Sequence, residues 1–213
     1  MALTNEAKII ATYLSDIFTG NLTAVAGVMG NIQAESNFRA NNLQNGYEKK
    51  FGLSDEEYTA QVDSGKIDKE TFMHDSAGYG LCQWTHWSRK QTLYDFAKEK
   101  RDSIGSLEMQ CAYLCEDLTC KYNTLYNNLS AETGTDYRAV YRTTKEFMLK
   151  YERPANQSEE NIERRAKLSW AIYQELTSKE TEINDIRNKV NSAIAVIEMK
   201  LDEIKEALKK DGN

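Results

Sequence analysis

Residues 26–38 read AGVMGNIQAESNF, a stretch of small and apolar side chains with one charged residue near its end. With Thr23 available as an N-terminal cap, the stretch predicts a helix over about 24–35. One face of this helix carries small residues that would let a neighbouring backbone approach closely: Ala26, Gly27 and Gly30. We therefore expect a closely packed helix that ends at or near Glu35.

Helical patterns continue on both sides of this stretch. Apolar residues share one face of a preceding helix predicted over 5–18. Residues 41–78 are polar with scattered glycines, so we expect a loop-rich region there, with a short helix after the capping box of Ser54 and Glu57. Further helices are expected at about 87–100, 106–119, 136–150 and 158–177. Since Pro154 is the only proline, these patterns favour an all-helical or α+β fold.

The C-terminal segment differs in composition from the rest. It is polar and charged, and its apolar residues recur every three or four positions: Ile183, Ile186, Val190, Ile194, Ile197, Leu201, Ile204 and Leu208. This narrow seam is nearly heptad, with an irregular step between Val190 and Ile194, and is typical of a coiled coil. We predict a folded domain over 1–177 and an amphipathic helix over 178–213 that makes the chain a homo-oligomer. A helix folded back on the domain is the alternative.

The composition excludes some partners. The net charge is −6 and the sequence pI about 5.2, so no basic surface for nucleic acid is expected. The N-terminal residues MALTNEAKIIATYL contain no basic leader with a following apolar stretch, and no segment approaches the roughly 18 apolar residues of a membrane span. We expect a protein made in the cytoplasm without a signal peptide and not inserted in a membrane.

Cysteine and histidine usage argues against a metal centre. The chain has four cysteines, Cys82, Cys111, Cys115 and Cys120, without the CxxC spacing of structural zinc. Buried free thiols are expected in a protein that carries no export signal. With His74 and His86 as its two histidines, the chain has no histidine-rich metal site. No metal and no cofactor are predicted.

Glu35 is the candidate for chemistry in the first stretch. A carboxylate at the C-terminal end of a helix meets the unfavourable end of the helix dipole, and apolar surroundings would raise its pKa further. A general acid needs such a raised pKa, because it must still hold its proton near neutral pH. The spacing by itself is more typical of a surface glutamate at a helix end.

A second stretch, residues 76–93, reads SAGYGLCQWTHWSRKQTL. The chain carries GNIQAES, a polar loop, GYGLCQW, an RK helix start and a later YERP, Tyr151 to Pro154. This succession resembles the phage-type lysozyme family, which is related to goose-type lysozymes and soluble lytic transglycosylases. The resemblance covers about residues 5–176. It implies a lysozyme-like catalytic domain, mainly α with a minimal β element, that acts on bacterial peptidoglycan.

The resemblance also implies roles for particular residues. In that family the glutamate of the ES pair is the catalytic acid, which here is Glu35. The GYGLCQW segment would form one wall of the glycan cleft. The implied substrate-binding residues are Ser36, Tyr79, Gln83, Trp84 and Tyr151. From the side chains alone, Trp84 fits a core aromatic as well as a cleft residue. The Gln83 side chain could likewise simply form hydrogen bonds with backbone groups.

Most glycoside hydrolases use two carboxyl groups. Asp75, just before the glycine-rich segment, is the best candidate for the second carboxyl group. Asp55 and Glu48 are the next candidates. A single glutamate also suffices in related enzymes, which position a water or use a hydroxyl group of the substrate.

These observations predict an endolysin-type muramidase that cleaves the MurNAc–GlcNAc linkage after holin-type release from the host cytoplasm. A tail-associated lysin is a close variant. The alternatives are a lytic transglycosylase or glucosaminidase on the same substrate, or an inactive wall-binding or structural phage module. A cysteine-type amidase is disfavoured, because Cys82 and His86 lie in one short segment rather than in two parts of a cleft.

Overall fold

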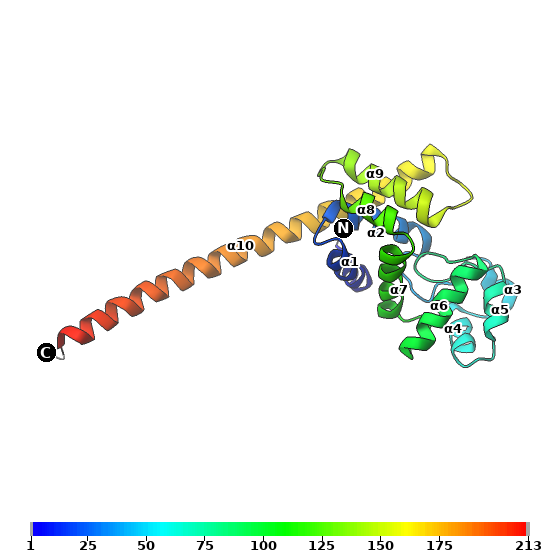
Figure 1. Ribbon diagram of the computed structural model, residues 1–213, viewed down its shortest axis with the longest axis horizontal. Helices are drawn as coiled ribbons and strands as arrows, with labels where there is room; N and C mark the ends of the chain where they lie inside the picture. Colours follow the sequence, from blue (N-terminus) through cyan, green and yellow to red (C-terminus); the bar gives the residue numbers. More distant parts are fainter. Residues whose placement is uncertain (1, 212–213) are drawn as a thin grey trace. The chain divides into compact units, whose positions relative to one another are not determined.

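The computed structural model describes residues 2–211, except for the side chains at 195, 196 and 202–211. The chain divides into two units, one up to Tyr173 and one from Gln174 onward. Regular structure in the described residues is helical, with isolated β-bridges and no strand (Figure 1). The predicted mainly α class is confirmed. The minimal β element is reduced to bridges that join Tyr79 to Leu43 and to Trp84.

Eleven helical elements follow one another along the described chain. They are α1 (Asn5–Ile17), α2 (Leu22–Ser36), α3 (Tyr47–Phe51), α4 (Asp55–Asp63), α5 (Lys69–His74), α6 (Trp87–Lys100), α7 (Leu107–Cys120), α8 (Asn123–Ser130), α9 (Tyr137–Phe147), the π-helix η1 (Met148–Glu152) and α10 (Glu159–Asp211). The longer predicted helices are confirmed as α1, α2, α6, α7 and α9.

Residues 41–78, predicted to be rich in loops, hold three short helices. The capping box of α4 is confirmed, because the Ser54 hydroxyl accepts from the Glu57 N–H at 3.2 Å and the Glu57 carboxylate accepts from the Ser54 N–H at 2.8 Å. Asp68 caps α5 by accepting from the Thr71 N–H at 2.8 Å. Helices this short contain too few turns for an apolar period to show, so the pattern missed α3 and α5.

The start of α2 also differs from the prediction. Asn21, not Thr23, is the N-cap, and its side chain accepts from the Ala24 N–H at 3.2 Å. The Thr23 hydroxyl instead donates to the Gly134 carbonyl at 2.7 Å. Both residue types are good caps, and this tertiary contact removes Thr23 from the role.

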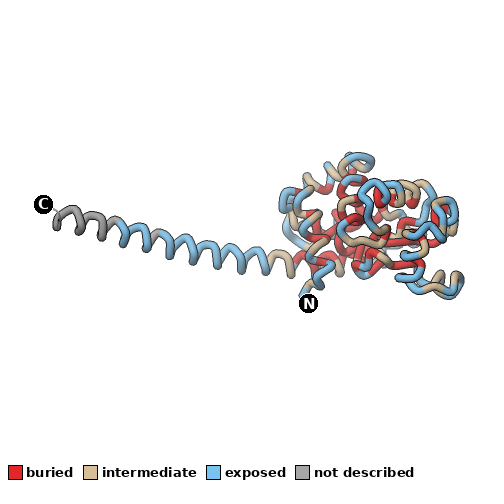
Figure 2. The backbone as a smooth tube through the Cα atoms, turned by 90° about the horizontal axis from the view of Figure 1, so that it is seen from below, coloured by how far each residue is buried: buried red, intermediate tan, exposed pale blue. Residues whose placement is uncertain are grey.

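Helix α2 is the central helix of the first unit and is buried on nearly all sides. Close packing at its small residues is confirmed. A Cβ added at Gly30 would lie 2.6 Å from the backbone nitrogen of Ser169 on α10, and one at Gly27 would lie 2.3 Å from the Thr143 hydroxyl on α9. Buried residues gather throughout this unit (Figure 2).

Helix α10 runs without a break from Glu159 to Asp211, across the boundary at 177–178 where the sequence predicts two separate helices. In its second part the described seam residues are half exposed, between 48% and 61%: Ile183, Ile186, Val190, Ile194, Ile197 and Leu201 (Figure 2). The side chains of Ile204 and Leu208 lie outside the described residues. Among the helices described, none has the length and apolar character needed to cross a membrane.

Candidate active site

A cavity of about 930 Å³ opens beside the end of α2. Its lining comes from five parts of the chain: Glu35 itself, residues within 42–45, residues within 76–89, Tyr122, and residues 151–155. The stretches that the sequence singled out therefore meet at one place.

Glu35 reaches this cavity because the chain turns sharply after it. Asn37 and Phe38 both have left-handed backbone conformations, with φ of 51° and 67°. The Asn37 N–H donates to the Gln33 carbonyl at 3.0 Å and ends the helix. The side chain of Glu35 keeps 19% of its surface exposed.

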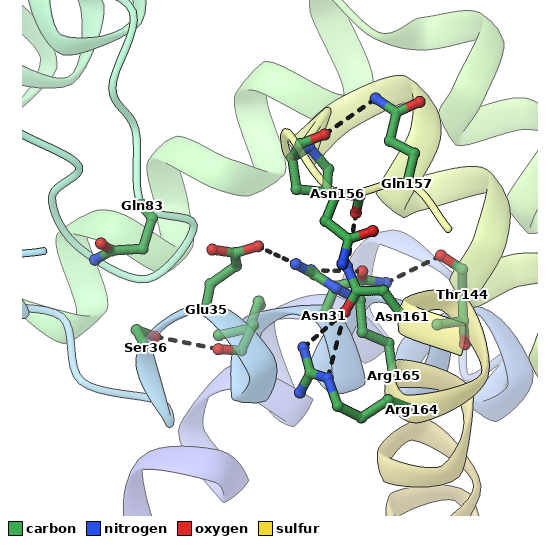
Figure 3. Close-up of polar contacts among 12 residues, drawn as sticks. Asn31, Glu35, Ser36, Gln83, Thr144, Asn156, Gln157, Asn161, Arg164 and Arg165 are labelled. Carbon is green, nitrogen blue, oxygen red and sulfur yellow. Dashed lines mark hydrogen bonds and ion pairs between the residues drawn. The ribbon is translucent and has the colours of Figure 1, made fainter. Parts of the chain in front are cut away.

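The surroundings of Glu35 are not the apolar ones expected. The guanidinium of Arg165, on α10, forms an ion pair and a hydrogen bond with the Glu35 carboxylate (Figure 3). Asn31, one turn before Glu35 on α2, accepts from the same guanidinium at 3.1 Å. Asn31 is itself fixed, because its amide donates to the carbonyls of Gly27 at 2.9 Å and Thr144 at 3.1 Å. The site thus holds a buried cation against the candidate acid.

Ser36 and Tyr79 do not line the cavity. The Ser36 hydroxyl donates to the Leu81 carbonyl at 2.9 Å, which ties the end of α2 to the glycine-rich segment. Tyr79 is fully buried, and its hydroxyl hydrogen-bonds to Thr59 at 2.6 Å. Gln110 of α7 holds the same segment by accepting from the Leu81 N–H at 2.9 Å. These contacts position the cavity wall from behind.

Gln83 lines the cavity and Trp84 does not. Gln83 has a left-handed backbone with φ of 45°, and its amide donates to the carbonyls of Asn42 at 3.0 Å and Gly80 at 3.1 Å. Trp84 is fully buried and donates to the Tyr151 hydroxyl at 3.3 Å. The core interpretation of Trp84 is therefore correct, and its indole supports the wall from inside.

Tyr151 lines the cavity although only 1% of its surface is exposed. Burial raises the pKa of its hydroxyl well above the usual range, so the phenol keeps its proton and donates to Asp117 at 2.9 Å. The ring stacks on Phe147 with centroids 4.8 Å apart. Tyr151 is thus an anchor of the cavity wall.

Asp75 is not among the cavity-lining residues. Its carboxylate is paired with Lys90 at 2.5 Å, accepts from the Ala77 N–H at 2.9 Å and is hydrogen-bonded to the Tyr58 hydroxyl. Asp55, the next candidate, is engaged by Arg39 at 2.9 Å and by the Leu43 N–H at 3.1 Å. Glu48 accepts from the Gly46 N–H at 2.7 Å. These three carboxylates hold loops together, away from Glu35.

Glu152 is a second acidic residue in the cavity lining, and the sequence analysis assigned it no role. Its Oε1 is shielded from solvent and makes no hydrogen bond within the described part of the chain. Burial, with the negative charge of Glu35 as the next cause, raises the pKa of Glu152 to about 8. The arginines Arg89 and Arg165 act in the opposite direction.

Residues 5–176 match the family model described as phage tail lysozyme. The chain belongs to the phage tail lysozyme family. The match covers the region of the predicted resemblance and contains every residue that lines the cavity. The family implies a lysozyme-like protein that acts on peptidoglycan. Neither the curated proteins nor the solved structures gave a match.

Cys82 lines the cavity without the properties of a nucleophile. Burial and the charge of Glu152 raise the pKa of its thiol well above the ordinary value, so the reactive thiolate does not form at neutral pH. All four cysteines are free; Cys82, Cys111 and Cys115 are buried as expected, whereas Cys120 is exposed. Within the described residues no group of side chains is arranged to hold a metal ion.

The residues that the sequence analysis missed are Glu152, Arg89 and Arg165. Glu152 stands inside the quoted YERP tetrapeptide, so that motif contained a signal for it. Arg89 likewise stands inside the quoted stretch 76–93, in the RK pair at the helix start, but it was given no role. Arg165 carries no comparable signal, because it looks like an ordinary helix-surface cation until the fold brings its helix to the cavity. Arg165 lies 130 positions from its partner Glu35.

Proposed function

We propose that this member of the phage tail lysozyme family is a muramidase that cleaves the MurNAc–GlcNAc linkage of peptidoglycan, with Glu35 delivering the proton to the leaving oxygen. The observation that carries the proposal is the position of Glu35, which emerges from the central helix into a cavity of about 930 Å³. This volume lies within the roughly 300–1,000 Å³ typical of ligand sites.

The proposed step is a hydrolysis with general acid catalysis. The glycosidic C–O bond breaks as the proton of Glu35 moves to the leaving oxygen, and a water molecule then bonds to the anomeric carbon. The proton that this water releases restores the acid. Gln83 and the Tyr151 wall would position the glycan, because both line the same cavity.

A Glu35→Gln variant tests the role of Glu35. The amide keeps the shape of the side chain and its hydrogen bonding to Arg165 but has no acid proton. We expect a loss of wall-clearing activity of about 100- to 10,000-fold, which is the usual contribution of general acid catalysis. Glu116→Gln, at an exposed position of α7, is the matched control. A folded Glu35→Gln protein that keeps more than about a tenth of the activity would exclude this mechanism and favour an inactive wall-binding module.

The choice of bond is tested by the products. Mass spectrometry of fragments from purified peptidoglycan distinguishes three outcomes. A reducing-end MurNAc supports the muramidase proposal. A reducing-end GlcNAc would indicate a glucosaminidase, and an anhydro-MurNAc would indicate a lytic transglycosylase.

We propose further that the chain consists of a catalytic domain over 1–177 and a C-terminal helix over 178–213 through which copies associate. The support is the row of half-exposed isoleucine, leucine and valine side chains from Ile183 to Leu201. An apolar seam of this length is stabilised when a second helix covers it.

The proposed biological setting is phage lysis, in which the enzyme reaches the wall after a holin opens the membrane. Family membership supports action at the cell wall. A tail-associated role is the alternative.

A further inference from the structure

Glu152 and Glu35 line one cavity from different elements. Glu152 is the last residue of η1, a single π-helical turn directly after α9. Such turns insert one extra residue and occur frequently at functional sites. Here Tyr151 and Glu152 both line the cavity, and Tyr151 is the buried one of the two. Arg153 ends the turn with a left-handed φ of 51°.

The groups around Glu152 come from four other parts of the chain. They are Glu35 on α2, Cys82 in the glycine-rich segment, Arg89 on α6 and Arg165 on α10. Within the described residues neither arginine forms an ion pair with Glu152. Arg165 is paired with Glu35, while Arg89 donates to the Tyr151 carbonyl at 3.1 Å and lies over the Tyr151 ring at 4.3 Å.

This arrangement makes the two carboxyl groups unequal. Glu35 has a direct cationic partner in the guanidinium of Arg165. Glu152 is shielded, has an oxygen without a hydrogen bond, and feels the negative charge of Glu35. Two carboxyl groups that interact electrostatically titrate as a pair, and the first proton to bind rests on the less solvated of them. The raised pKa of Glu152, about 8, agrees with this geometry.

We propose that Glu152 stores the proton that Glu35 delivers to the glycosidic oxygen, so that the two carboxyl groups carry a single proton between them. This rests on the proposed role of Glu35. Because the two carboxyl groups share the cavity without a direct hydrogen bond between them, a water molecule in the cavity relays the proton. The O–H bond of Glu152 breaks as this water takes its proton, the water gives one of its own protons to Glu35, and Glu35 passes it to the leaving oxygen while the glycosidic C–O bond breaks. The proton released by the attacking water returns to the pair. Glu152 acts through Glu35 and is a positioning residue.

The test is the pH profile of Glu152→Gln, a variant of nearly the same shape with no acid proton. The readout is kcat/KM on soluble peptidoglycan oligomers between about pH 5 and pH 9. Wild type should stay active up to the pKa of the pair and decline above it. In Glu152→Gln the alkaline decline should begin at least about one pH unit lower, which is a tenfold loss relative to wild type near pH 8. The control Glu116→Gln should keep the wild-type profile.

Carbon-13 NMR of labelled glutamate carboxyl groups gives a readout that does not depend on activity. Wild type should show one carboxyl group that titrates near pH 8. This resonance should be absent in Glu152→Gln, and in Glu35→Gln its titration should move to lower pH because the neighbouring negative charge is gone. If Glu152→Gln does not fold, the shift in Glu35→Gln decides the matter.

Two results overturn the proposal in distinguishable ways. An inactive Glu35→Gln together with an unchanged alkaline limb in Glu152→Gln removes the proton-storage role and leaves the proposed function standing. A fully active Glu35→Gln removes the proposed function, and the storage role with it.

Discussion

At the scale of single residues, Asp75 and Lys90 show how a buried charge serves the structure. Their side chains are 6% and 0% exposed, and their charged atoms are 2.5 Å apart. Lys90 also donates to the Ala77 carbonyl at 3.1 Å and lies over the Phe72 ring at 4.2 Å. Together these contacts fasten the start of the glycine-rich segment to α6. A position beside the segment therefore does not make Asp75 part of the cavity.

We expect Asp75→Asn to lower stability and to leave catalysis largely intact. The change leaves the Lys90 charge buried without its partner, which typically costs about 3–5 kcal/mol. Urea denaturation measures the loss, and kcat measured well below the unfolding temperature tests the chemistry. The control is Asp95→Asn, which removes a surface pair with Lys69 and should cost about 1 kcal/mol or less. A large loss of kcat in a stable Asp75→Asn protein would restore Asp75 as the second carboxylate.

At the scale of elements, α2 brings the cavity and the core together. Its glycines allow α9 and α10 to pack against its backbone, and its last turn carries Glu35. Ser169, which contacts Gly30, lies one turn after Arg165 on the same face of α10. The packing at Gly30 therefore also sets the position of the guanidinium that binds Glu35.

Gly30→Ala should destabilise the protein and reduce activity together. In an open helix this substitution stabilises by about 1 kcal/mol, because alanine is the better helix former. Here the new Cβ would lie 2.0 Å from the Ser169 hydroxyl and 2.6 Å from the Ser169 backbone nitrogen, so the two helices must move apart. We expect a net cost of about 1–3 kcal/mol by chemical denaturation. If Gly30→Ala is as stable as wild type or more stable, the helices accommodate the added Cβ beside Ser169 without a net cost in stability.

At the scale of the whole molecule, the C-terminal helix offers a way to raise affinity for a polymeric substrate. The chain is acidic, with a net charge of −6, so it gains no general attraction to anionic wall polymers. Linked catalytic domains raise one another's effective concentration on a repetitive polymer. The half-exposed seam would supply that link.

Light scattering should find an oligomer for the full chain and a monomer for a version that ends at Leu176. A full-length variant with Ile186→Gln and Ile197→Gln, both at exposed seam positions, should also be monomeric and controls for chain length. Truncation should reduce lysis of whole walls more than cleavage of short soluble glycans. If the full chain is a monomer at concentrations of tens of micromolar, the seam packs on its own catalytic domain or on another protein.

Sequence by itself determined the features that depend on neighbours along the chain. The apolar period placed α1, α2, α6 and α7, the capping box placed α4, and the motif order led to the family and to Glu35. Periodicity, capping and small-residue faces are local properties, so the residues carry them before the chain folds.

Only the tertiary structure decided which of the motif residues reach the cavity and what surrounds them. Trp84 and Tyr79 lie in the core, where their rings pack among other buried side chains. Asp75 lies outside the cavity lining because it forms an ion pair with the buried Lys90. Arg165 pairs with Glu35 although the two residues lie 130 positions apart in the sequence. The groups that surround Glu152 also come from several separate parts of the chain. Burial and long-range pairing depend on how helices pack, and packing places side chains by three-dimensional proximity that spacing along the chain does not encode.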